Sequence, residues 1–196
     1  MPKQSIKLPC LHYDKRAYLL TLMLLFSTLN IASEQAGITV KAATLNLQDQ
    51  THLLNASINY SLSNEAIKAL NNGITLTFNV ELSIIEPRRW LWDKHHANVT
   101  LAYQIKYHTL AETYQVLDVR NSVRHSFSRL EPALHALGTL NEIPLHALTM
   151  VYKPNSSVSL KAYLNIEALP LPMRPMAYIT SGWYLRSDTY QWTLKK

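Results

Sequence analysis

Cationic and aromatic side chains gather at one point of the sequence and are its strongest candidates for binding chemistry. Arg88, Arg89, Trp90 and Trp92 lie close together, and a lysine and two histidines follow them. Side chains two positions apart share a face of an extended chain, so both indole rings would lie beside the cations. Such a surface favours contact with an anionic lipid or an anionic envelope glycan. The alternative is that both tryptophans close one end of a core while the charges face water.

Histidines are the sequence's candidates for a metal site. His95 and His96 could bind a metal ion together with His108. Neighbouring side chains of an extended segment point to opposite faces, however, and no carboxylate or cysteine stands at a recognised ligand spacing. We therefore predict no metal site and no cofactor.

Carboxylates could in principle supply the acid and base of a hydrolase. The candidates are Glu81, Glu86, Glu112 and Asp118. A general acid and a general base need convergent geometry, and carboxylates more often lie on solvated faces. Because Ser181 also lacks the motif of a nucleophile elbow, no catalytic residue is predicted.

Four aromatic residues near the end of the chain could form a stacking surface. Trp183, Tyr184, Tyr190 and Trp192 lie on either side of a turn predicted at Ser187 and Asp188. Such rings bind sugars or peptides, but a β-sandwich core would use the same residues.

Composition narrows the class of protein. Of the 196 residues, 47% are hydrophobic and 16% are charged, which is typical of a folded domain. The four glycines are isolated, so the sequence contains no glycine-rich loop for a nucleotide phosphate. The first 33 residues hold four of the 19 basic residues and one of the 13 acidic ones, so residues 34–196 carry a formal charge of +3. This mild charge argues against a nucleic-acid partner, which needs a dense basic face.

An export signal is predicted over residues 1–33. Four basic residues precede an uncharged run of 13 residues at 17–29, and Ala32 and Ser33 suit cleavage. As a helix this run spans about 20 Å, short of the ~30 Å hydrocarbon core of a bilayer, so cleavage is favoured over an uncleaved anchor in the inner membrane. The single cysteine, Cys10, lies within this signal. We expect a periplasmic or otherwise extracytoplasmic protein.

Residues 34–196 are predicted to form a single, mainly β domain. Alternating apolar and polar residues predict strands at 38–46, 53–62, 74–84, 99–107, 110–119, 147–152, 157–168, 177–186 and 189–194. The first two strands would join near Asp49, and strands 74–84 and 99–107 would form a hairpin. Two short helices are expected, one between a cap at Ser63 and Gly73, the other after a capping box that begins at Ser128.

The order of these elements favours an antiparallel β-sandwich or an open barrel, because strands and helices do not alternate regularly. Residues 169–175 contain three prolines, which lack the N–H group that a central strand needs. This segment is therefore predicted to be an extended crossing or an edge.

Several short motifs occur in a characteristic order. They are the junction at 69–78, the pairs Arg89-Trp90 and Trp92-Asp93, the stretches at 101–103 and 114–116, and the ending at 169–175 with Trp183 and Ser187. In this order the chain resembles the bacterial domain-of-unknown-function 4390 family, the proline-rich signal-peptide proteins. The resemblance implies an exported envelope protein without an established enzymatic activity, and an association with genes for nitrogen-responsive sensor kinases. It supplies no catalytic residues.

The sequence alone is compatible with three classes of function. The first is a non-catalytic periplasmic interaction or binding module, linked to a membrane sensor kinase or another envelope or inner-membrane protein. Its predicted contact residues are Arg88, Arg89, Trp90 and Trp92. The alternative is a hydrolase or carrier for an envelope glycan or lipid, with a cleft between sheets, and a third is a structural accessory. A deep cleft with convergent carboxylates would favour the hydrolase.

Overall fold

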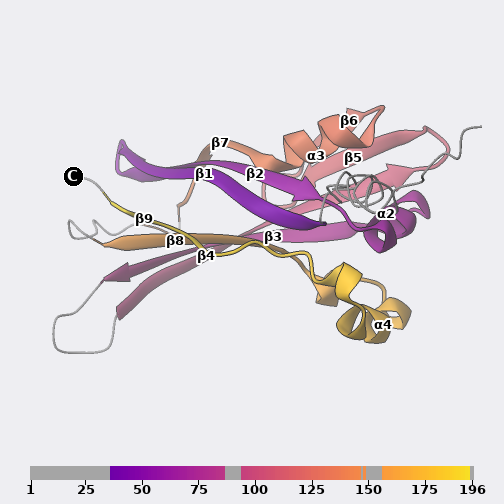
Figure 1. Ribbon diagram of the computed structural model, residues 1–196. Helices are drawn as coiled ribbons and strands as arrows, with labels where there is room; N and C mark the ends of the chain where they lie inside the picture. Colours follow the sequence, from indigo (N-terminus) through magenta and orange to yellow (C-terminus); the bar gives the residue numbers. More distant parts are fainter. Residues whose placement is uncertain (1–35, 87–93, 147, 149–155, 195–196) are drawn as a thin grey trace, which may run out of the picture. The chain divides into compact units, whose positions relative to one another are not determined.

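Strands with alternating apolar residues form most of the regular structure. The computed structural model describes residues 36–86, 94–146, 148 and 156–194, all within one unit of residues 35–196. The described strands are β1 (Gly37–Gln48), β2 (Thr51–Ser61), β3 (Leu76–Glu86), β4 (Lys94–His108), β5 (Thr113–Asp118), β6 (Val123–Phe127), β7 (Thr139–Pro144), β8 (Ser157–Leu164) and β9 (Tyr190–Thr193). The helices are α2 (Asn64–Asn71), α3 (Leu130–Gly138) and α4 (Arg174–Ile179), with the 3-10 turns η1 (Ile166–Ala168), η2 (Leu171–Met173) and η3 (Ser181–Trp183) (Figure 1). Of the helices in these residues, none is long and apolar enough to cross a membrane.

The smaller sheet is built on the hairpin of β1 and β2, with β7 on the far side of β2. The strands pair antiparallel across a turn at Asp49 and Gln50, whose φ angles are 47° and 63°. Left-handed conformations at both positions match the twist of the flanking strands. The predicted hairpin is confirmed, whereas β7 was not predicted, because its sequence shows no clear alternation.

The larger sheet has six antiparallel strands in the order β6-β5-β4-β3-β8-β9. Its centre is β3, in which Phe78 lies opposite Tyr103 on β4 and opposite Leu164 on β8. The predicted hairpin of β3 and β4 is confirmed. The strand β6, which pairs with β5, was not predicted.

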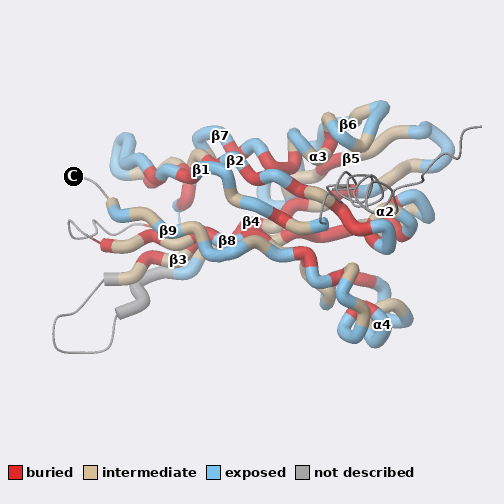
Figure 2. Tube along the Cα trace, viewed as in Figure 1, coloured by how far each residue is buried: buried red, intermediate tan, exposed pale blue. Residues whose placement is uncertain are grey.

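The core lies between the two sheets, which Figure 1 shows as two layers. Leu54 and Ile58 of β2 and Phe78 and Leu82 of β3 are all buried, and the buried positions alternate along the strands (Figure 2). Burial of one such side chain stabilises the fold by about 1.5–3 kcal/mol. The mainly β prediction is confirmed, and the two antiparallel sheets correspond to the sandwich rather than to the barrel.

Two of the helices are those that the sequence predicted. The Ser63 hydroxyl accepts a hydrogen bond from the Ala66 N–H at 3.1 Å and so caps α2, as expected. The helix α3 begins at Leu130, but its cap residue Arg129 makes no side-chain hydrogen bond to the helix. The predicted capping box at Ser128 is therefore wrong, although the helix itself is present.

The C-terminal part differs most from the prediction. Residues 177–186 were expected to form a strand, but they contain the end of α4 and the turn η3, with a single bridge from Arg186 to Tyr163. Residues 169–175 are η2 and the start of α4 rather than an extended crossing, because proline at the first helical positions suits a helix start. The predicted strand at 157–168 ends at Leu164. The strand predicted at 147–152 lies almost wholly outside the described residues.

Candidate functional site

The basic and aromatic segment singled out from the sequence falls outside the described residues. Arg88, Arg89, Trp90 and Trp92 lie in the stretch 87–93, between β3 and β4 in the chain. The strands on either side of it are paired as far as Glu86 and Lys94. The contact predicted for these four residues stays a prediction.

The candidate metal site finds no support in the described residues. His95 and His96 belong to β4, and their side chains lie outside the description. His108, at the end of the same strand, has its Nε2 3.3 Å from Oε1 of Gln115. Within the described part of the chain no group of three potential ligands comes together.

The described candidate carboxylates lie on separate elements, and two of them make structural contacts. Glu81 on β3 pairs with Lys161 on β8, with Oε2 and Nζ 3.3 Å apart. Asp118, at the end of β5, accepts hydrogen bonds from the backbone N–H of Arg120 and from Asn121. Glu112 lies in the turn between β4 and β5, with a φ of 50°. These three groups do not form the convergent pair that a hydrolase needs, and the side chain of Glu86 lies outside the description.

Two buried tyrosines are the described groups with clearly shifted pKa values. Burial raises the pKa of Tyr103 to about 12; the charge of Asp118 acts in the same direction, and Arg120 opposes it. Burial, reinforced by Tyr103, raises the pKa of Tyr60 further still. Both hydroxyls therefore stay protonated at neutral pH, and neither could act there as a general base. The Tyr60 ring contacts Phe78 edge to face, with centroids 5.0 Å apart, which is a packing role.

The C-terminal aromatic residues do not form one stacking surface. Trp183 is buried, and Tyr190 and Trp192 pack against the core from β9 with their ring centroids 5.8 Å apart. Tyr184 is half exposed, with the Arg186 guanidinium 5.9 Å above its ring. The sandwich core therefore accounts for three of the four rings.

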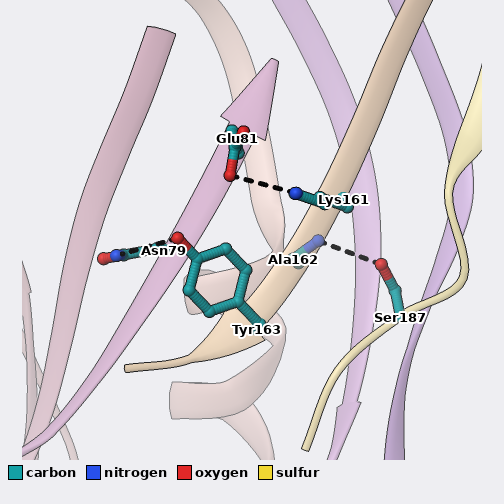
Figure 3. Close-up of polar contacts among 6 residues, drawn as sticks. All are labelled: Asn79, Glu81, Lys161, Ala162, Tyr163 and Ser187. Atoms are coloured by element: carbon teal, nitrogen blue, oxygen red, sulfur yellow. Dashed lines mark hydrogen bonds and ion pairs between the residues drawn. The ribbon is translucent and has the colours of Figure 1, made fainter. Parts of the chain in front are cut away.

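A cavity of about 320 Å³ lies where the chain after η3 runs beside β8. It is lined by Lys161, Ala162, Tyr163, Leu164, Ile166, Trp183, Tyr184, Leu185, Arg186 and Ser187. Ser187 joins the two segments: its hydroxyl accepts from the Ala162 N–H at 2.9 Å (Figure 3). Its own N–H also donates to the Ala162 carbonyl at 2.8 Å. The Tyr163 hydroxyl accepts from the Asn79 amide at 3.5 Å.

These contacts hold the edge of the sheet together. The cavity has no carboxylate in its lining, and the Lys161 ammonium is already paired with Glu81. The cavity is therefore not the deep cleft with convergent carboxylates that would favour a hydrolase.

The most unusual described surface is formed by residues 169–184, which we call the α4 lobe. It consists of η2, α4 and η3, and in Figure 1 α4 stands clear of both sheets. The buried residues Leu169, Ala177 and Trp183 attach it to the domain, and η3 contacts α2 as well as α4. The lobe is thus a packed extension of the core with one side facing solvent.

Hydrogen bonds fix the conformation of the lobe. The Arg174 Nε donates to the Leu169 carbonyl at 2.8 Å, and the Tyr184 hydroxyl donates to the Tyr178 carbonyl at 2.8 Å. The Thr180 N–H donates to the Met176 carbonyl at 3.1 Å and closes α4. The backbone that carries the exposed side chains of the lobe is therefore fixed by bonds within the lobe itself.

The solvent side of the lobe is apolar. Leu171 is 72% exposed, Met176 61% and Ile179 79%, and the rings of Tyr178 and Tyr184 are about half exposed. Clustered exposed apolar side chains mark interaction sites on soluble domains, whereas single ones carry no such meaning. Sequence reasoning missed this site, because Met176 and Ile179 have the side chains of core residues. The signal that was available is Pro175, which favours the start of a helix just before the expected strand at 177–186.

Comparisons with known proteins give one match. A family model described as Domain of unknown function (DUF4390) matches residues 35–193. No curated protein and no solved structure matches the chain. The family predicted from the order of the sequence motifs is confirmed.

Proposed function

The chain belongs to the DUF4390 family, and on that premise we propose that it is a non-catalytic interaction module of the bacterial cell envelope. The α4 lobe is its contact surface, and its partner is a component of the inner membrane. A membrane sensor kinase, implied by the family resemblance, is one such component. The domain is exported by the signal predicted in residues 1–33 and works in the periplasm.

The observation that carries this proposal is the exposure of Leu171, Met176 and Ile179 on one small extension. Leaving three large apolar side chains in water has no benefit for folding, since each would gain about 1.5–3 kcal/mol from burial. Contact with a partner supplies that burial. The rigid attachment through Trp183 and Ala177 supports a surface that is formed before binding.

The non-catalytic part of the proposal rests on the placement of titratable groups. Glu81, Glu112 and Asp118 occupy separate elements, and the buried hydroxyls of Tyr60 and Tyr103 stay protonated at neutral pH. A carrier of a small glycan or lipid is the second candidate, and the cavity beside Tyr163 is the observation that favours it. It ranks second because three of the polar side chains at that cavity, those of Lys161, Tyr163 and Ser187, already have partners within the protein.

Substitution of Ile179 tests the proposal. Formaldehyde crosslinking in intact cells, followed by capture of the tagged full chain, should yield adducts with inner-membrane components. We expect Ile179→Asp to lower the adduct yield about tenfold or more, because the loss of one buried isoleucine costs about 1.5–3 kcal/mol before the charge is counted. The yield is measured by quantitative mass spectrometry.

Leu110→Asp is the matched control, because Leu110 is fully exposed in the turn between β4 and β5. It makes the same chemical change on a different element and should leave the adducts unchanged. Equal yields from both variants, each with the melting temperature of the unsubstituted protein, would contradict the assignment of the lobe.

A further inference from the structure

We propose that the α4 lobe binds the anionic lipid surface itself, with Leu171, Met176 and Ile179 inserted among the acyl chains. This inference rests on the proposed function and names the partner of the same surface. The lobe would enter the interface between head groups and acyl chains, and the two sheets would remain in water.

The composition of the solvent side favours lipid. Every exposed residue between 170 and 179 is apolar or aromatic; these residues are Pro170, Leu171, Pro172, Pro175, Met176, Tyr178 and Ile179. A protein-binding surface carries a polar rim around its apolar centre, whereas Ser181 is the one exposed residue of the lobe that is neither apolar nor aromatic. An apolar surface with so few polar groups matches what an acyl-chain region accepts.

Several backbone positions of the lobe need no hydrogen bond to water. A polar backbone group in lipid needs a partner within the protein. Prolines at 170, 172 and 175 have no N–H to satisfy, and the N–H groups of Met173, Thr180 and Trp183 donate within the lobe. At these six positions no N–H hydrogen bond to water would be lost on insertion.

Aromatic and cationic groups lie where the head groups would be. Tyr178 and Tyr184 are half exposed, and tyrosine is enriched at membrane interfaces. The lobe itself contains one cation, Arg174, and no acidic residue, and Arg186 follows it in the chain, so its own charge complements an anionic lipid surface. Acidic groups lie on the segments next to the lobe: Glu65 on α2 is packed against Gly182, and Glu167 on η1 and Asp188 beyond Arg186 are exposed.

A fluorescent label on the lobe tests this inference in the full chain. Cys10→Ser removes the single native cysteine, and Met176→Cys then carries an environment-sensitive probe. With vesicles of phosphatidylethanolamine and phosphatidylglycerol we expect a blue shift and quenching by brominated acyl chains. Vesicles of phosphatidylcholine alone should bind more weakly. Arg186→Gln should weaken binding to the anionic vesicles about fivefold.

The control carries the same probe at Leu110→Cys, on the turn between β4 and β5. It should show neither the blue shift nor the quenching, even if residues 17–29 tether the chain to the vesicle. Adding Ile179→Asp to the Met176→Cys protein should abolish both signals.

The outcomes separate the two proposals. If the probe at 176 is not quenched while crosslinked protein adducts still depend on Ile179, the lipid inference is wrong and the lobe binds a protein. If neither signal depends on Ile179, the proposed contact surface is wrong as well. If the probe at 176 is quenched equally in vesicles without anionic lipid, the apolar side chains insert but the arginines do not select an anionic surface, and the inference of an anionic partner is wrong.

Discussion

Gly138→Ala should destabilise the domain by about 3 kcal/mol or more. Among the glycines Gly73, Gly138 and Gly182, this is the position at which an added methyl group should cost the most stability. A Cβ at position 138 would overlap the Ile58 carbonyl oxygen and would lie 3.0 Å from the Ile58 carbonyl carbon. The strand β2 is paired on both sides, with β1 and with β7, so its backbone cannot move aside without disturbing that pairing. The end of α3 therefore packs on β2 through a glycine because no larger residue fits.

Gly182→Ala is the matched control for this prediction. A Cβ there would also overlap an atom, but that atom is the carboxylate of Glu65, the far end of a flexible side chain. We expect a change of less than about 1.5 kcal/mol, since Glu65 can rotate away. Urea unfolding, followed by circular dichroism, measures both variants. Similar unfolding midpoints for the two alanine variants would contradict the close packing of α3 on β2.

Trp183→Ala should cost about 3–5 kcal/mol and should release the α4 lobe from the domain. Trp183 is 6% exposed, and it lies on η3, which contacts both α2 and α4. Its removal leaves a cavity beneath the lobe, so the apolar side chains of α4 lose their fixed arrangement. Binding through the lobe should fall together with the stability.

Trp192→Ala separates the loss of stability from the loss of binding through the lobe. Trp192 is only partly buried and lies on the edge strand β9, away from α4 in the chain. We expect a smaller loss of stability, as measured by urea unfolding, and no change in the crosslinked adducts. Full retention of the adducts in Trp183→Ala would show that the lobe does not depend on its buried tryptophan, and loss of the adducts in Trp192→Ala would show that they follow the general stability of the domain instead.

The parts of the fold that were predicted correctly are those in which local pattern and burial agree. In β3 every second residue from Leu76 to Ile84 is buried, so alternation in the sequence reports the position of the core directly. The helix α2 carries its own start signal, because the Ser63 hydroxyl bonds to the first turn. Such signals depend on neighbours in the chain and need no knowledge of the rest of the fold.

The parts that were missed depend on contacts distant in sequence. The strand β7 pairs with the edge of β2 that β1 leaves free, where Leu140 lies opposite Ala56 and Ile143 lies opposite Leu54. In residues 177–186 the apolar spacing resembles a strand, yet Pro175 lies in the first turn of a helix whose inner residue Ala177 is buried against the domain. Tertiary packing decides such segments, and the sequence does not show it.

The candidate site could not be predicted for a related reason. Chemical reasoning selects residues with unusual side chains, such as Arg88, Arg89, Trp90 and Trp92, whose contact stays a prediction. An interaction surface made of leucine, methionine and isoleucine differs from a core only in its exposure. That property appears once the fold places Met176 and Ile179 in solvent.

Photocrosslinking from position 179 in living cells tests the central claim most directly. A photoreactive amino acid replaces Ile179 in one protein and Leu110 in another, and the adducts are identified by mass spectrometry. The claim that the lobe is the contact surface predicts adducts with inner-membrane lipid or protein from position 179 and none from position 110. An absence of membrane adducts at 179, in a protein that folds and is exported normally, would contradict it.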